Sequence, residues 1–176
     1  MNDFVSDLKK IKQRARAHME QGAVTENYKA QLPQVHKVLN EVLATELVCT
    51  LRYRRHYYTV SGLNSESVKA EFLQHANEEQ QHADWVATRI VQLNGQPNFN
   101  PEGLSTRSHS EYNESEDLVS MLKEDLYAER IAIESYSEIV RWLKDDDPTT
   151  RKLIEDILKV EEEHAEDLKT LLEKVN

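Results

Sequence analysis

The chain has 176 residues, 39% of them hydrophobic, which suits one domain with a core of ordinary size. Its 32 acidic and 22 basic residues give a net charge of −10, which disfavours a nucleic-acid-binding surface over the whole chain and favours the attraction of cations. No apolar run approaches bilayer length, the N-terminus lacks the apolar stretch of a secretory signal, and the single Cys49 excludes an internal disulfide or a four-cysteine iron site. We therefore expect a cytoplasmic protein without a membrane partner, whose metal ligands are carboxylates and imidazoles.

Only four Gly and four Pro occur in the chain, which favours an all-α fold with long helices and few turns. The first predicted helix spans residues 3–20, where apolar residues recur at helical spacing, at Phe4, Leu8, Ile11 and Ala15. Five basic residues against three acidic ones give this segment a local charge of +2. We expect it to pack through its apolar side on its own or a neighbouring subunit, and contact with DNA phosphate through its basic side is the alternative.

Four longer stripes of apolar residues follow, each with helical spacing. The first runs from Pro33 to Gly62, the second from Asn64 or Ser65 to Asn94-Gly95, the third from near Ser115 to Leu143, and the fourth from Asp147-Pro148 to Val175. The second and third stripes are separated by residues 95–113, which contain two Pro and two Gly and show little periodicity. This long crossover would let the second and third helices run parallel, as in a four-helix bundle with one long connection. Residues 1–30 then form an N-terminal helix and linker, and residues 31–176 the bundle domain.

Each of the four stripes is interrupted near its middle by one glutamate, at Glu46, Glu79, Glu129 and Glu161. The second and fourth stripes also carry a histidine three residues after that glutamate, His82 and His164, on the same helical face. Four unpaired carboxylates in a core would cost several kcal/mol each, roughly, without protons or cations. Two divalent cations would balance the four negative charges, with one imidazole donor for each cation. The pattern, one Glu from each of two helices and Glu-x-x-His from each of the other two, is typical of di-iron and di-manganese bundles.

An internal repeat supports this interpretation. Segment ELVCTLRY begins at Glu46 and segment ERIAIESY begins at Glu129, and each places a tyrosine seven residues after its glutamate. The second glutamate of each half follows the first by 33 residues in one half and by 32 in the other. We therefore expect a site with approximate twofold symmetry.

These residues resemble bacterioferritin over most of residues 35–172. The segments that carry the resemblance are ELVCTLRYRRHYY, EEQQHADWVATRIVQLNGQPN and EEEHAEDLKTLL. The resemblance implies a ferritin-like four-helix bundle with a long crossover between its second and third helices, preceded here by an extra amphipathic helix. It also implies that Glu46 and Glu129 are terminal ligands, that Glu79 and Glu161 bridge two iron ions, and that His82 and His164 bind one ion each. Tyr53 falls on the family's tyrosine beside the di-iron centre and would be an electron donor, although a core tyrosine is an equal alternative.

The chain departs from bacterioferritin at two places. Bacterioferritin binds haem through a methionine directly after the first bridging glutamate, and Gln80 stands there, so we do not expect haem. Only 12 residues follow His164, which leaves no room for the short fifth helix typical of shells of 24 subunits. We therefore favour a homo-oligomer of 12 subunits, as in the Dps-like DNA-protecting miniferritins.

The expected activity is a ferroxidase: oxidation of Fe²⁺ to Fe³⁺ by O₂ or H₂O₂ at two iron ions per chain, with iron storage and detoxification in an oligomeric shell. A Dps-like DNA-protecting miniferritin and a di-iron peroxidase without storage are the alternatives. Mn²⁺ suits the same ligands as Fe²⁺. His75, one turn before Glu79, could bind a transient iron, but we favour a hydrogen-bonded or exposed histidine; Cys49 is interpreted as a buried small hydrophobic residue.

Overall fold

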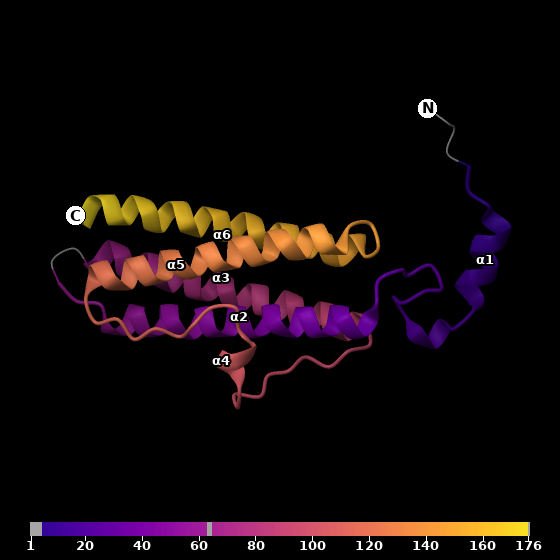
Figure 1. Cartoon of the computed structure of the whole chain (residues 1–176), viewed down its shortest axis with the longest axis horizontal. Helices are drawn as coiled ribbons and strands as arrows, with labels where there is room; N and C mark the ends of the chain where they lie inside the picture. Colours follow the sequence, from indigo (N-terminus) through magenta and orange to yellow (C-terminus); the bar gives the residue numbers. More distant parts are fainter. Residues whose placement is uncertain (1–4, 63–64, 176) are drawn as a thin grey trace.

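The structure is a computed structural model that describes residues 5–62 and 65–175. This part of the chain contains helices and no strands, and four long helices form a bundle (Figure 1): α2 (Leu32–Thr59), α3 (Ser65–Gln92), α5 (Leu118–Leu143) and α6 (Pro148–Val175). Their 26 to 28 residues make each of them roughly 40 Å long. The predicted all-α four-helix bundle is confirmed.

The long connection between α3 and α5 runs along the whole bundle and contains a single helical turn, α4 (Leu104–Arg107), which the sequence pattern did not predict (Figure 1). Because of this crossover, α3 and α5 run in the same direction, while α2 and α6 run in the other. The bundle therefore consists of two antiparallel hairpins, α2–α3 and α5–α6, and the predicted parallel pair is confirmed.

The apolar interior is divided into two clusters. One includes Leu39, Val86, Ile139 and Ile157, and the other includes Tyr53, Phe72, Leu122 and Leu168. In each of the four long helices a short stretch of buried polar residues lies between the segments that belong to the two clusters. A polar layer thus crosses the bundle near the middle of its helices.

The ends of the helices follow the capping preferences of their sequences. Asp117 accepts a hydrogen bond from the backbone nitrogen of Ser120, 2.9 Å away, so α5 begins three residues later than the pattern near Ser115 suggested. Asp147 accepts a hydrogen bond from the backbone nitrogen of Thr150 at 2.9 Å and caps α6 at the predicted place. After α3, Asn94 takes the left-handed conformation, and a Cβ added at Gly95 would lie 2.8 Å from the ring of His36. The Asn-Gly pair therefore suits this turn for two different reasons: Asn tolerates the left-handed conformation, and Gly leaves room for the ring of His36.

The N-terminal helix is shorter than the predicted residues 3–20. Helix α1 (Leu8–Arg16) starts after Asp7, whose carboxylate accepts a hydrogen bond from the backbone nitrogen of Lys10, and a left-handed residue, His18, follows it before a 3₁₀ turn. Figure 1 places α1 beyond one end of the bundle, and none of its residues is buried. Two residues of the predicted pattern, Phe4 and Asn64, lie outside the described residues. No helix in the described part of the chain combines the length and the hydrophobicity that crossing a membrane requires.

The linker between α1 and α2 is attached to the bundle by Tyr28. Its hydroxyl donates a hydrogen bond to Asp147 Oδ2 at 2.8 Å, and Arg89 donates to the other oxygen of the same carboxylate at 2.9 Å. Asp147 therefore joins the linker, α3 and the start of α6 at one end of the bundle.

Candidate metal centre

The polar layer brings together the six glutamate and histidine residues that the sequence singled out. The four long helices contribute one glutamate each, and α3 and α6 also contribute one histidine each. All six side chains are at most 2% exposed. They are Glu46, Glu79, His82, Glu129, Glu161 and His164.

The six residues form two overlapping groups of four, in which the donor atoms all lie within 4.8 Å of one another. One group contains Glu46 and His82, the other contains Glu129 and His164, and both contain Glu79 and Glu161. Nδ1 of His82 lies 3.2 Å from Glu46 and 3.1 Å from Glu161, and Nδ1 of His164 lies 3.5 Å from both Glu79 and Glu161. The two shared glutamates are thus placed between two potential metal positions.

Several polar atoms in this layer have no hydrogen-bond partner. They are Oε1 of Glu79, Oε2 of Glu129, both carboxylate oxygens of Glu161, and Nδ1 of His164. Native interiors rarely leave buried polar atoms unpaired, and such atoms often mark a functional role or an ion. Carboxylate oxygens and imidazole nitrogens are donors that Fe²⁺, Mn²⁺ and Zn²⁺ accept, so this donor set fits two divalent cations.

Burial and close packing shift the pKa values of several side chains in the layer. Burial, together with repulsion from Glu79 and Glu161, raises the pKa of Glu46 and the pKa of Glu129 well above their usual range. Burial alone would lower the pKa of His82, but the close carboxylates of Glu161, Glu46 and Glu79 outweigh burial and raise that pKa to about 12. Burial would likewise lower the pKa of His164, but the surrounding carboxylates outweigh burial and raise that pKa. Protons and a bound cation would therefore compete for these side chains.

Two tyrosines connect the halves of the layer crosswise. The hydroxyl of Tyr53 on α2 donates to Oε1 of Glu129 on α5, and the hydroxyl of Tyr136 on α5 donates to Oε1 of Glu46 on α2. Both rings are fully buried, and burial raises the pKa of each phenol well above its usual range. Tyr53 is therefore a buried tyrosine beside the centre, and Tyr136 is its counterpart. The sequence contained the signal for Tyr136, because both tyrosines follow their helix's glutamate by seven residues.

Two further residues lie near the layer, and one of them, Glu78, was not singled out from the sequence. Glu78, half-buried on α3, lies with its Oε2 2.8 Å from Nε2 of His164 and so contacts the outer side of that ring. His75 was expected to be hydrogen-bonded or exposed, and this expectation is wrong. Its side chain is fully buried, neither ring nitrogen makes a hydrogen bond, and burial, followed by the charge of His164, lowers its pKa to about 3.

A buried ion pair lies beside the layer, between α2 and α5. Nε of Arg52 donates to Oδ1 of Asp125 at 2.8 Å, and Nδ1 of His56 lies 2.8 Å from Oδ2 of the same carboxylate. Arg52 also donates to the backbone oxygen of Glu111 at 3.2 Å and contacts Sγ of Cys49 at 3.6 Å, which ties the crossover to α2. Cys49 is buried, as expected, and burial raises the pKa of its thiol well above its usual range. The sequence did contain a signal that Asp125 is buried, because Asp125 lies four residues before Glu129 and so on the same face of the helix.

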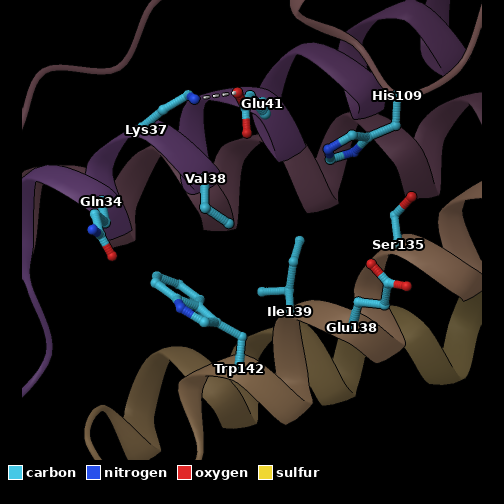
Figure 2. Close-up of a pocket in the computed structure, with 9 residues that line it drawn as sticks. All are labelled: Gln34, Lys37, Val38, Glu41, His109, Ser135, Glu138, Ile139 and Trp142. Carbon is cyan, nitrogen blue, oxygen red and sulfur yellow. Dashed lines mark ion pairs between the residues drawn. The ribbon is translucent and has the colours of Figure 1, made fainter.

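A separate pocket opens between α2 and α5 (Figure 2). Val38 on α2 faces Ile139 and Trp142 on α5 across it, and the ion pair between Lys37 and Glu41 lies on the α2 side. None of the six residues of the polar layer lines this pocket. The polar layer, and not this pocket, is therefore the candidate metal centre.

Comparisons with known proteins identify the family. The model of the ferritin-like domain matches residues 36–176. A bacterioferritin from Desulfovibrio desulfuricans is 27% identical over 132 residues, which cover 74% of this chain and 70% of that protein. A structure of the bacterioferritin of that species, which describes its diiron site in different catalytic states, has a TM-score of 0.72 and 25% identity, with 82% of this chain and 81% of that chain covered.

Two further structures share the fold. The dodecameric thioferritin from Bacteroides fragilis, a bacterioferritin-related protein, has a TM-score of 0.80 and 32% identity, and the match covers 84% of this chain and 89% of that chain. Dps from Thermosynechococcus elongatus has a TM-score of 0.76 at 20% identity over 80% of this chain and 90% of that chain, a likeness of fold alone. The family match covers all of the bundle except its first four residues and includes all six residues of the polar layer. The chain therefore belongs to the ferritin-like family.

Proposed function

We propose that the protein is a ferroxidase of the bacterioferritin kind, which oxidises Fe²⁺ to Fe³⁺ and stores the product in an oligomeric shell. The observation that carries the proposal is the pair of overlapping donor groups that share Glu79 and Glu161. An arrangement with two shared carboxylates suits a pair of metal ions, which lie about 3.5–4 Å apart in such centres. The unpaired carboxylate oxygens and the family of the chain support the same conclusion.

Each of the six residues has a proposed role. Glu46 and His82 would hold one Fe²⁺, Glu129 and His164 would hold the other, and Glu79 and Glu161, which belong to both donor groups, would contribute to both. Four carboxylates and two Fe²⁺ ions then carry no net charge, so the buried layer is neutral when it is loaded. The hydroxyls of the two crosswise tyrosines hold the terminal carboxylates in place through their hydrogen bonds.

The proposed reaction transfers one electron from each Fe²⁺ to the oxidant. Two Fe²⁺ ions supply two electrons, which with two protons reduce O₂ to H₂O₂, or reduce H₂O₂ to two molecules of water. The protons that cation binding displaces from the layer are available nearby for this reduction. An electron from Tyr53, whose ring is buried beside Glu129, would take the place of one from Fe²⁺ when only one Fe²⁺ is bound, so that the oxidant still receives two electrons. Mn²⁺ fits the same donors as Fe²⁺. Haem is not part of the proposal, because Gln80 offers an amide in place of a thioether, and Nε2 of this amide donates a hydrogen bond to Asp84 at 3.2 Å.

The direct test is an anaerobic titration of metal-free protein with Fe²⁺, followed by rapid mixing with oxygen or peroxide. We expect a fast phase of oxidation whose amplitude saturates at two Fe²⁺ per chain, because the layer offers two metal positions. Stopped-flow absorbance of Fe³⁺ measures both the rate and the amplitude. Saturation at one Fe²⁺ per chain, or the absence of a fast phase, would contradict the proposal.

Assembly into a closed shell is expected, because storage of ferric mineral requires an enclosed cavity. Twelve chains of 20.5 kDa would give a particle of about 246 kDa, against about 492 kDa for 24 chains. We favour twelve, in agreement with the dodecameric relative at 32% identity. Sedimentation or light scattering measures this mass, and a stable monomer or dimer would favour a peroxidase that does not store iron.

Contact with DNA is a second candidate activity, supported by one observation. Helix α1 lies beyond the end of the bundle, and all its lysine and arginine side chains are exposed (Figure 1). Residues 1–20 carry a charge of +2, whereas the rest of the chain carries −12. Any affinity for phosphate would therefore come from α1, with the bundle opposing it.

A further inference from the structure

His75 has surroundings that its burial alone does not explain. The ring stacks on His164, with 3.9 Å between the ring centroids, and meets Tyr53 edge-on at 5.2 Å. The side chain is fully buried, yet both ring nitrogens lack a hydrogen-bond partner. A buried imidazole that makes no hydrogen bond calls for a ligand, because native interiors pair almost all such groups.

Two carboxylates lie near this imidazole at distances that suit a shared cation. Nε2 of His75 is 3.5 Å from Oε1 of Glu71, one turn earlier on α3, and 3.9 Å from Oδ2 of Asp167 on α6. An N–H···O hydrogen bond is shorter, about 2.7–3.2 Å. Two donors bound to one divalent cation at about 2.1 Å each are roughly 3–4 Å apart. The donor atoms of all three residues lie within 4.8 Å of one another.

The same histidine also belongs to a group that leads to the metal centre. His75, Glu78 and His164 form a second triad whose donor atoms lie within 4.8 Å of one another. In the first group, the exposed fraction of the side chain falls from 53% at Asp167 to 28% at Glu71 and 0% at His75, so the group leads from the surface to the interior. A pocket between α3 and α6, lined by Asp167, Glu78 and His164 among others, opens this side of the bundle.

We infer that Glu71, His75 and Asp167 form a third divalent-cation site in each chain, which takes Fe²⁺ from solvent and delivers it past Glu78 to the two-metal centre. The inference that a cation binds here depends only on Glu71, His75 and Asp167, whereas the inference that it is delivered to the two-metal centre rests on the proposed function. The chemistry is that of a loading site: one neutral nitrogen and two carboxylates bind Fe²⁺ with no net charge left over, and the exposed Asp167 gives access to solvent.

Anaerobic titration of the assembled, metal-free protein with Co²⁺ tests the site, because Co²⁺ suits the same donors and allows bound ions to be counted without oxidation. Asp167→Asn is compared with Asp156→Asn, a matched control on the same helix whose side chain is also 53% exposed. By equilibrium dialysis and metal analysis, we expect Asp167→Asn to bind one Co²⁺ per chain fewer than Asp156→Asn. Equal binding by the two variants would overturn the third site.

Glu161→Ala separates this inference from the proposed function. This variant should lose Co²⁺ from the two-metal centre and keep the ion that Asp167→Asn loses. If Glu161→Ala binds as much Co²⁺ as the parent protein while Asp167→Asn still loses one ion, the third site stands and the proposed two-metal centre fails.

Delivery is tested by the rate of Fe²⁺ oxidation at iron concentrations below saturation. We expect Asp167→Asn to oxidise Fe²⁺ roughly tenfold more slowly than Asp156→Asn, because electrostatic focusing at a loading site raises capture rates by about this factor or more. The amplitude at saturation should remain two Fe²⁺ per chain. Equal rates for the two variants would overturn the delivery role.

Discussion

Replacement of Glu161 by alanine is expected to lower the initial rate of rapid Fe²⁺ oxidation at least about 100-fold. Loss of a group that only supports a metal ligand typically costs 10–100-fold in affinity or activity, and loss of a ligand shared by two metals should cost at least as much. Glu161 is 1% exposed, belongs to both donor groups, and has no hydrogen bond to either carboxylate oxygen. Stopped-flow oxidation of two Fe²⁺ per chain by oxygen measures the loss.

Glu162→Ala is the matched control for this substitution. Glu162 is the next residue on α6, about 100° around the helix from Glu161, and its side chain is exposed. The substitution Glu162→Ala removes one carboxyl group, as Glu161→Ala does, and should leave the rate close to that of the parent protein. His82→Ala removes a ligand from one metal position only, so its damage should be no greater than that of Glu161→Ala.

The opposite ranking would be decisive. If Glu162→Ala abolishes rapid oxidation while Glu161→Ala leaves it intact, then the face of α6 assigned to the centre is wrong, and the site assignment fails with it.

Replacement of Asp125 by alanine should cost about 3–5 kcal/mol in the free energy of unfolding, the range for removal of one partner of a buried ion pair. Asp125 is fully buried, and its two oxygens engage Arg52 and His56 at 2.8 Å each. The substitution would leave the buried guanidinium of Arg52 without its counter-charge. Because natural domains are stable by only about 5–15 kcal/mol, the midpoint of urea unfolding should fall clearly.

Glu134→Ala is the control for the loss of Asp125. Glu134 is acidic and lies on the same helix, but its side chain is exposed, so its loss should change the free energy of unfolding by no more than about 0.5 kcal/mol. Simultaneous replacement of Arg52 and Asp125 by apolar residues should restore part of the lost stability, because no unpaired charge then remains. A cost below about 1 kcal/mol for Asp125→Ala would show that the guanidinium finds another partner.

The sequence predicted the bundle and the residues of the polar layer because both depend on helical periodicity. A buried face recurs about every 3.6 residues, so a glutamate such as Glu46 or Glu129 in the middle of an apolar stripe is visible without coordinates. The long segment of residues 95–113 likewise predicted the parallel pair of helices, because a tight turn cannot contain it. The single turn of α4 within this segment was missed, since four residues are too few to show a period.

The extent of α1 depended on local backbone geometry that apolar spacing does not reveal. The pattern of residues 3–20 continued past Arg16, whereas the left-handed conformation of His18 follows the end of the helix, and Asp7 caps its start. The position of α1 beyond the bundle could not be predicted either, because an amphipathic face indicates that a helix can pack and not where it packs.

By itself, then, the sequence determined the all-α fold, the topology, and the set of glutamates and histidines on the inner faces of four helices. Only the tertiary structure decided which side chains meet across helices: Tyr53 with Glu129, Tyr136 with Glu46, Asp125 with Arg52, and His75 with Glu71 and Asp167. The physical reason is that periodicity fixes the direction of a side chain around its own helix. The distance between side chains on different helices depends instead on how the helices are shifted and rotated against one another, which the packing of the whole core sets.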